Sequence, residues 1–338
     1  LDQTAAGSFQ TFPRARPSEW INNPMSPAPP SESVPNLGTR LMSIDALRGF
    51  DMFWIMGADS LVYALNRMNK NPVTGFFGDQ LEHVDWAGFH FYDLIFPLFV
   101  FIAGVSLVFS LTKNIAQAGR HGALKRLFTR SVLLFVVALL YSGGFSSPWP
   151  DMRLLGVLNR IALCYFFAGL IFIYCRPRVM ASLGVALLLG YWALLTFVPI
   201  RDIRLEKSSL AALARQDGNE ALAKTIEGPT NPSTIRNSPV MAFAEKAFAT
   251  TTTRVTGKYE PGYNLANHLD FQYLPGKKWD DFQDPEGLLS TIPAIVTCLL
   301  GVFAGLLLQN TGVDDRRKVT LLVGCGAAAV ILGFLWGL

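Results

Sequence analysis

A histidine and several carboxylates precede a long apolar run in residues 82–107, EHVDWAGFHFYDLIFPLFVFIAGVSL. An imidazole with an ordinary pKa of about 6.5 can take up or release a proton near neutral pH, and a nearby carboxylate can fix its tautomer. His83 and Asp93 are therefore the leading candidates for acid–base chemistry at a membrane boundary. The alternatives are an interfacial histidine without a catalytic role and an aspartate that caps a helix.

The apolar segment 42–65 contains a second group of ionisable residues. A helix advances about 100° per residue, which places Asp45, Arg48 and Asp59 on one face and Asp51 elsewhere. Asp45 and Arg48 are three residues apart, close enough to pair. Ionisable groups inside hydrocarbon usually face a cavity or a partner. This face is therefore either a functional site or an ion pair that fixes helix packing.

The apolar segment 153–175 carries Asn159 and Arg160 about two turns inside its outer end. An arginine at this depth needs a carboxylate, a backbone carbonyl or an anionic ligand. A polyphosphate is one candidate, because a guanidinium stays charged and binds phosphate through two nitrogens. A salt bridge to one of the aspartates is the alternative.

The composition indicates what kind of fold must position these residues. Of the 338 residues, 51% are hydrophobic and 16% charged, and the mean hydropathy is +0.31. This balance predicts an all-α, polytopic transmembrane helix bundle rather than a soluble domain. The net charge of +4 is modest and the basic residues are dispersed, so nucleic-acid binding is not expected. The four cysteines lack metal-ligand spacing, and we expect no metal site.

The chain divides into a tail, two groups of membrane spans and a loop between them. A spanning helix needs about 20 apolar residues. Seven segments are candidates: 42–65, 90–112, 127–142, 153–175, 179–199, 288–308 and 318–338. We interpret 1–40 as a polar tail, 41–199 as the first five spans, 200–287 as a loop or cap, and 288–338 as the last two spans. The last span is cut off at Leu338, so we expect further helices beyond it.

Basic residues lie on alternate loops, at Arg40, in 113–126, at Arg176 and Arg178, and in 316–318. Lysine and arginine mark the cytoplasmic loops of membrane proteins. The amino terminus is therefore expected in the cytoplasm, and segments 66–89 and 200–287 on the extracytoplasmic side. The pattern is typical of a multi-pass protein of a bacterial inner membrane.

Two local patterns concern the segment 284–305. Asp284, Pro285 and Glu286 follow the order of an N-cap, a first helical position and a first turn, so a helix is expected to begin there. Gly301 and Gly305 form a GxxxG pair, which permits close helix contact. The pair would serve either packing within the chain or a homodimer interface.

Four motifs lie within residues 40–308. In chain order they are SIDALRGFDMFWIMG, HVDWAGFHFYDLIFPLFVFIAGVSL, LLGVLNRIALCYF, and NLANHLDFQYLPG followed by DPEGLLSTIPAI. They resemble the heparan-alpha-glucosaminide N-acetyltransferase family of transmembrane acyltransferases. The resemblance implies transfer of an acetyl group from cytosolic acetyl-CoA to an amino sugar across the membrane. It places the proposed catalytic histidine on His83 and the following aspartate on Asp93, and it matches Arg48 and Asn159–Arg160 to family positions. Animal members have asparagine where this chain has Asp59, and residues 201–260 look like an insertion.

These observations lead to a two-sided mechanism as a hypothesis. Acetyl-CoA is the co-substrate, and its phosphates bind basic groups at the cytoplasmic mouth. The candidates for these groups are Arg48, Arg126, Arg130 and Arg160. The pantetheine arm runs between helices to His83, which acts as base or nucleophile while Asp93 orients it. Asn159 or a backbone N–H stabilises the oxyanion, and Asp59 is a further catalytic candidate.

Two other functions are compatible with the same residues. A transporter for a small anionic or sugar solute also has intramembrane charges, and it would contain two matching halves. No inverted repeat is evident in the sequence. A binding or scaffold protein with an inactive site would show no turnover of acetyl-CoA.

Overall fold

The computed structural model describes residues 42–67, 71–144, 151–228 and 238–337. The expected polar tail, residues 1–40, lies outside the described residues. Asp59 belongs to a described helix, but its side chain is outside the described part of the structure.

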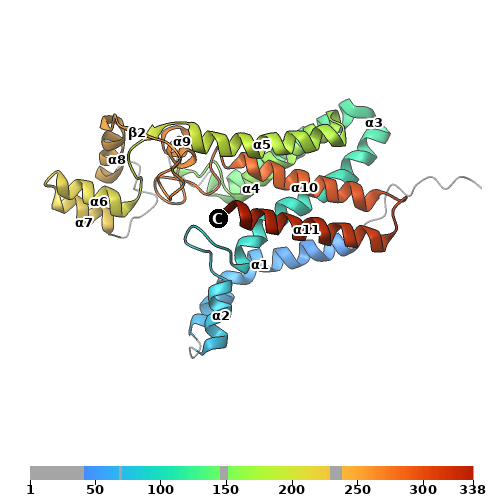
Figure 1. Ribbon diagram of the computed structural model, residues 1–338, viewed down its shortest axis with the longest axis horizontal. Helices are drawn as coiled ribbons and strands as arrows, with labels where there is room; N and C mark the ends of the chain where they lie inside the picture. The colour runs from blue at the N-terminus through green and yellow to red at the C-terminus, as the bar shows by residue number, and fades with distance from the viewer. Residues whose placement is uncertain (1–41, 68–70, 145–150, 229–237, 338) are drawn as a thin grey trace, which may run out of the picture. The chain divides into compact units, whose positions relative to one another are not determined.

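The described chain is almost entirely helical, which confirms the all-α prediction (Figure 1). The α-helices are α1 (Met42–Arg67), α2 (Pro72–Gln80), α3 (Ile95–Tyr141), α4 (Val157–Tyr174), α5 (Pro177–Phe197), α6 (Lys207–Gln216), α7 (Glu220–Glu227), α8 (Pro239–Thr250), α9 (Leu265–Tyr273), α10 (Thr291–Gln309) and α11 (Asp315–Gly337). A short 3-10 helix, η1 (Phe91–Leu94), precedes α3. Strands β1 (Ile200–Arg201) and β2 (Arg254–Val255) pair antiparallel.

Several helices are long and apolar enough to cross a membrane, as a polytopic protein requires. The described chain has five such segments: 91–141, 157–174, 177–197, 291–309 and 315–337. The first expected span forms α1 but is not among the five, since its ionisable residues, including Asp45, Arg48 and Asp51, lower its hydropathy. The second and third expected spans together form the segment 91–141.

Helix α3 is a hairpin rather than one straight rod (Figure 1). At Gly119 the backbone has a φ of 67° and a ψ of −178°, a conformation that glycine adopts without steric penalty. Arg130 donates a hydrogen bond to Ser110 at 3.1 Å, although residues this far apart in a straight helix would be separated by about 30 Å. The halves 95–118 and 120–141 are therefore antiparallel, and they match the second and third expected spans.

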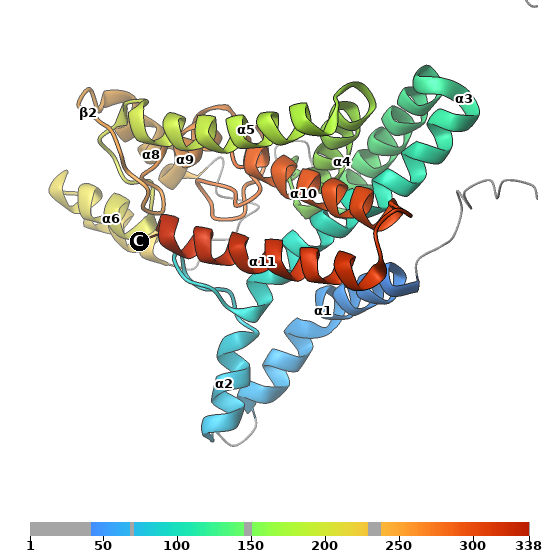
Figure 2. The same ribbon diagram turned by 45° about the vertical axis from the view of Figure 1, so that its right-hand side comes forward.

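Helix α10 packs closely against the first half of α3. A Cβ atom at Gly301 would stand 2.0 Å from the carbonyl oxygen of Phe101, and one at Gly104 would stand 2.0 Å from that of Cys298. Gly305 of α10 likewise faces Val108 of α3. The GxxxG pair is thus used for packing within the chain, one of the two roles that the sequence predicts. On its other sides α10 runs between α5 and α11 (Figure 2).

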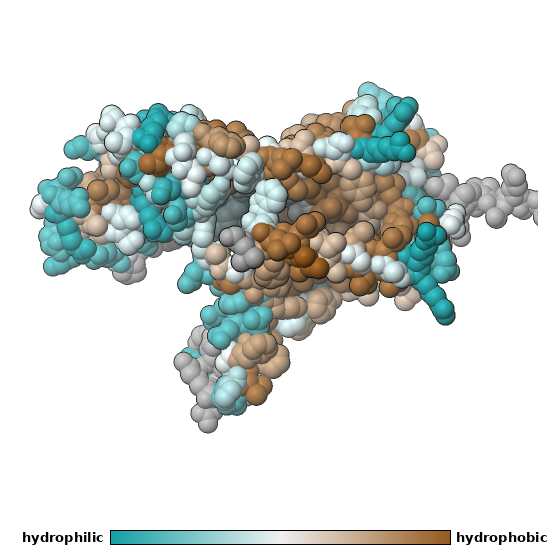
Figure 3. Space-filling view, in the orientation of Figure 1, coloured by the Kyte–Doolittle hydropathy of each residue, from teal (hydrophilic) through white to brown (hydrophobic). Residues whose placement is uncertain are grey.

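The outer surfaces of the long helices are apolar (Figure 3). Leu133 of α3, Val185 of α5 and Phe334 of α11 are all exposed, and α11 has no buried residue. Soluble monomers rarely expose such extended apolar surface. Polar residues gather instead over α6 and α7. The distribution is the one expected when the long helices face lipid.

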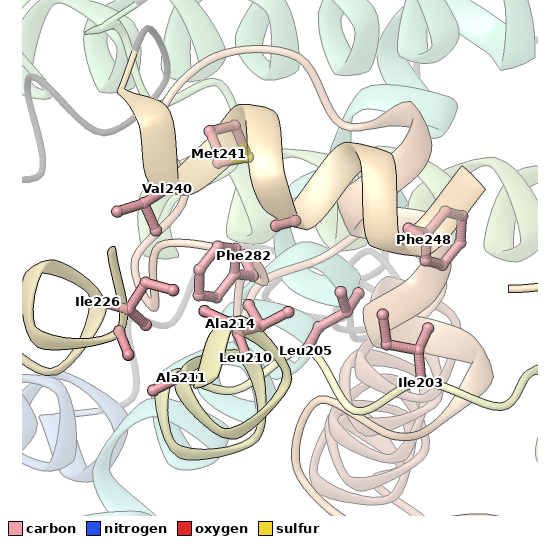
Figure 4. Packing of buried hydrophobic residues seen from close by; sticks show 12 residues of the cluster. Ile203, Leu205, Leu210, Ala211, Ala214, Ile226, Val240, Met241, Phe248 and Phe282 are labelled. Carbon is pink, nitrogen blue, oxygen red and sulfur yellow. The ribbon is translucent and has the colours of Figure 1, made fainter. Parts of the chain in front are cut away.

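The described residues of the segment 200–287 form a cap with its own hydrophobic core (Figure 4). Leu210 of α6, Ile226 of α7 and Phe248 of α8 pack around Phe282. Helices α6 and α7 are separated by a turn at Gly218, where φ is +77°. The cap therefore holds together through buried apolar side chains rather than as an extended loop.

The expected helix start at Asp284 is wrong, because α10 begins seven residues later, at Thr291. The Asp284 carboxylate accepts hydrogen bonds from the side chain of Arg153 and from the backbone N–H groups of Trp279 and Glu286. These bonds hold residues 279–286 in turns, so Asp284 organises a loop instead of capping a helix.

The start of α4 also differs from the sequence prediction. Residues 153–156 are not helical, and Arg153 forms an isolated β-bridge with Gly276. Helix α4 begins at Val157. Asn159 and Arg160 therefore lie in its first turn and not two turns inside it.

Candidate active site

The structure brings His83 and Asp93 together. The Nδ1 atom of His83 lies 2.6 Å from Oδ1 of Asp93. Because a carboxylate only accepts hydrogen bonds, Nδ1 carries the proton and Nε2 keeps a free lone pair. The His83 side chain is 66% exposed, so Nε2 can be reached by a substrate. This arrangement is that of a general base with an orienting carboxylate.

Two contacts hold this pair in position. The second carboxylate oxygen of Asp93 accepts a hydrogen bond from the backbone N–H of His90 at 2.8 Å, at the start of η1. The His83 ring also packs on Tyr92, with 4.7 Å between ring centroids. Asp93 therefore makes contacts of both kinds considered from the sequence, one with a histidine and one with the start of a helix.

Two of the predicted coenzyme ligands, Arg48 and Arg130, line one groove. Arg48 of α1 donates to Ser106 at 2.9 Å, and Arg130 in the second half of α3 donates to Ser110 at 3.1 Å. The two serines are one helical turn apart, so the guanidinium groups stand on adjacent turns of one helix face. Arg48 also pairs with Asp45 at 3.5 Å, as the spacing predicts.

The groove that contains these arginines has a volume of about 460 Å³. Beyond its polar end it is apolar, and its lining includes Phe99, Ile102, Leu134 and Tyr165. Along the first half of α3 its lining extends from Ser110 back to Phe99, a helix length of about 16 Å. Asp93 lies six residues before Phe99, so the groove runs along α3 in the direction of the histidine–aspartate pair and ends before it.

Three other predicted site residues, Arg126, Asn159 and Arg160, are engaged in contacts within the protein. Arg126 donates to Asn114 at 2.8 Å inside the α3 hairpin. Asn159 is fully buried, and its amide accepts from the backbone of Gly156 and donates to the carbonyl oxygen of Phe135. The amide group of Asn159 is thus held by the protein through both its oxygen and its nitrogen.

Arg160 lies at the cap end of α4, away from the groove that Arg48 and Arg130 share. It donates to the carbonyl oxygen of Pro285 at 2.8 Å and to the hydroxyl of Ser290. Its guanidinium therefore ties α4 to the loop before α10, as an arginine at the end of a buried helix must do to satisfy its donors.

An ion cluster that was not predicted joins the start of α4 to the cap. Arg153 donates to Asp284 at 2.8 Å and 2.5 Å and to Glu286 at 2.5 Å, and its guanidinium stacks on Trp279. Burial alone would lower the pKa of Arg153, but the hydrogen bond and charge of Asp284 raise it. The partners are about 130 residues apart in sequence, so no local pattern could have revealed the pairing.

A polar cavity in the cap was likewise not predicted. It has a volume of about 300 Å³ and is lined by Trp86 of the histidine loop, Tyr191 of α5, Asp270 of α9 and residues of the loop that precedes α10. Burial raises the pKa of Asp270 to about 6, so this carboxylate is still ionised at neutral pH. The sequence signal for this cavity is limited to residue types, because the segments NLANHLD and DFQDPE are rich in amides and carboxylates.

The fold and these contacts define a polytopic helical membrane protein with an accessible histidine–aspartate pair and an arginine-lined groove. The chain belongs to the family described as heparan-alpha-glucosaminide N-acetyltransferase, catalytic, whose profile matches residues 40–210, about half of its length. This assignment confirms the resemblance seen in the sequence motifs.

Curated relatives match over a shorter part of the chain. Heparan-alpha-glucosaminide N-acetyltransferase of Mus musculus is 35% identical over 104 residues, which cover 28% of this chain and 16% of the mouse protein. The Homo sapiens protein of the same name is 34% identical over 104 residues, which cover 28% of this chain and 15% of the human protein. The alignment thus spans less than a fifth of either relative.

Proposed function

We propose that this protein is a membrane-embedded acetyltransferase that moves an acetyl group from acetyl-CoA to the amine of an amino sugar. The observation that carries the proposal is the 2.6 Å contact between His83 and Asp93, just before α3, whose first half lines the arginine groove. Family membership supports the reaction class.

The groove supports acetyl-CoA as the donor. Phosphate groups need fixed positive charge, which Arg48 and Arg130 supply at one end. An extended, mostly apolar pantetheine arm suits the remaining wall of aromatic and aliphatic side chains. Arg126, one helical turn from Arg130, adds positive charge near the same end.

His83 acts as the general base in this proposal. Its Nε2 atom takes a proton from the acceptor nitrogen as that nitrogen attacks the thioester carbonyl. The carbon–sulfur bond then breaks, and the CoA thiolate takes the proton back from the imidazolium. Asp93 keeps the imidazole in the required tautomer and stabilises its charged form.

The same geometry allows His83 to act as a nucleophile that carries the acetyl group in a covalent intermediate. The two versions differ when no acceptor is present. A nucleophile leaves labelled acetyl on the protein after incubation with labelled acetyl-CoA, and a base leaves none.

We also propose an orientation in the membrane. The His83 loop and the cap lie at one end of the helices, where Trp86 donates a hydrogen bond to the carbonyl oxygen of Tyr259 at 3.0 Å. The α3 turn, with basic residues such as Arg120 and Lys125, lies at the other end (Figure 1). The charge rule supports a cytoplasmic position for that turn and an extracytoplasmic one for the cap, in a bacterial inner membrane.

The test is incubation of the purified protein with labelled acetyl-CoA and a panel of amino sugars. We expect an N-acetylated sugar from the parent protein and a loss of about 10²- to 10⁴-fold in His83→Ala. His121→Ala, which changes a histidine at the turn of the α3 hairpin, is the matched control and should retain transfer. Full transfer by a folded His83→Ala protein would refute the role of this histidine.

A further inference from the structure

The cavity in the cap is built as a binding site. It lies between α5, α9 and the loop 280–290, and Trp86 closes one side three residues after His83. Trp86 is held there by its hydrogen bond to Tyr259, which also lines the cavity. A volume of about 300 Å³ is at the lower limit for small-molecule sites, so it suits one small ligand.

Two buried amides offer free donors to this cavity. The backbone N–H of Gly262 donates to Oδ1 of Asn267 at 3.1 Å and to Oε1 of Gln283 at 3.0 Å. Gly262 has a φ of +66°, and a Cβ there would stand 2.6 Å from the carbonyl oxygen of Leu205, so the position of this donor is fixed. Both amide oxygens are thereby assigned, and within the described residues the amide nitrogens of Asn267 and Gln283 donate to no protein group. Both side chains are more than nine-tenths buried and line the cavity.

Asp270 adds a buried acceptor. It is 1% exposed, and among the described residues the hydrogen bond that its carboxylate accepts comes from the backbone N–H of Leu288 at 2.8 Å. Asp280 and Asp284 also line the cavity, while no arginine, lysine or histidine is among its described lining residues. Arg153 neutralises Asp284 from behind. Arg160 also stands behind the lining, where it donates to Pro285 and Ser290. The described side chains that face the cavity nevertheless include three carboxylates and no basic group, which disfavours an anionic ligand.

We propose that this cavity binds the sugar ring of the acceptor, and that it accepts a neutral or cationic ring and rejects sulfated or carboxylated ones. Hydroxyl groups can accept from the amides of Asn267 and Gln283 and donate to Asp270. Aromatic side chains such as Trp86 and Tyr191 supply apolar faces for the C–H side of a ring. The name acceptor rests on the proposed acetyltransferase function; the sugar site itself does not.

The experiment measures sugar binding to the purified full chain without acetyl-CoA, by isothermal titration calorimetry. The probes are D-glucosamine, D-glucose and D-glucosamine 6-sulfate. The variants are Asp270→Asn and Gln283→Met, of which the second leaves the Gly262 N–H bonded to Asn267. Asp217→Asn makes the same chemical change as Asp270→Asn at an exposed position of the cap and is the matched control.

We expect the parent protein to bind glucosamine and glucose, and to bind glucosamine 6-sulfate at least about tenfold more weakly. Each cavity variant should weaken the binding of glucosamine about tenfold or more. Asp270→Asn should also reduce the discrimination against the sulfated sugar, whereas Asp217→Asn should bind like the parent. Equal binding of sulfated and unsulfated sugars, or parent-like binding in both cavity variants, would overturn the proposal. If the parent protein binds these sugars as expected but transfers no acetyl group to them, the proposed function is refuted and the sugar site is not.

Discussion

Replacing Asp93 by asparagine tests the histidine–aspartate pair more sharply than removing the side chain does. The backbone N–H of His90 needs an acceptor, so the single oxygen of an asparagine is expected to face it. The NH₂ group then faces Nδ1 of His83 and donates to it. This forces the proton onto Nε2 and removes the lone pair that acts as the base.

The size of the loss follows from two contributions. Losing a hydrogen bond to a charged group costs about 1.5–3 kcal/mol, which is roughly tenfold to a hundredfold in rate, and this applies to both Asp93→Ala and Asp93→Asn. The unfavourable tautomer adds about 1 kcal/mol, or roughly fivefold, in Asp93→Asn alone. Since His83 is two-thirds exposed and water competes, the lower half of each range applies. The conservative asparagine is therefore expected to be the more damaging change.

The assay is the initial rate of labelled acetyl transfer to glucosamine at saturating donor, between about pH 6 and pH 9. Unchanged affinity for acetyl-CoA serves as the folding control. The reasoning fails if Asp93→Asn stays within about threefold of the parent, or if Asp93→Ala is clearly the less active variant.

Three further predictions follow from other contacts. Arg48→Ala and Arg130→Ala should each weaken the binding of acetyl-CoA about tenfold. The binding of acetyl-pantetheine should not change, because this donor lacks the nucleotide phosphates. Equal losses of affinity for both donors would show that these arginines have a structural role. Gly301→Ala should sharply lower the melting temperature, because the added Cβ would overlap the α3 backbone. Gly326→Ala, on the exposed helix α11, is the control and should leave the melting temperature unchanged. Similar melting temperatures for the two variants would contradict the close packing of α10 on α3. Burial raises the pKa of Asp270 to about 6, so the folded protein binds this proton more tightly than the unfolded chain does. Stability should therefore fall as the pH rises from about 4 to 6, and Asp270→Asn should flatten that fall in thermal unfolding.

The sequence predicts the features that depend on neighbouring residues. The histidine and its aspartate are ten residues apart in one motif, so a single loop can bring them together. Hydropathy locates most spans, because a membrane helix needs a long apolar run. The pairing of Asp45 with Arg48 follows from helical spacing alone.

Features that depend on distant residues could not be predicted in this way. Asp284 resembles an N-cap locally, but the loop that it organises depends on Arg153, about 130 residues earlier. The cavity amides have defined orientations only because Gly262, in another turn, donates to both. The depth of Arg160 depends on where α4 begins, which tertiary contacts of the preceding residues decide.

The proposed function and orientation together imply that an acetyl group passes from a donor on one side of the membrane to an acceptor on the other. The most direct measurement uses the purified protein in sealed lipid vesicles, with labelled acetyl-CoA added outside and D-glucosamine trapped inside. We expect labelled N-acetylglucosamine to accumulate in the vesicle interior with the parent protein and not with His83→Ala. An unlabelled interior, with the same preparation active once detergent mixes both substrates, would contradict transfer across the membrane.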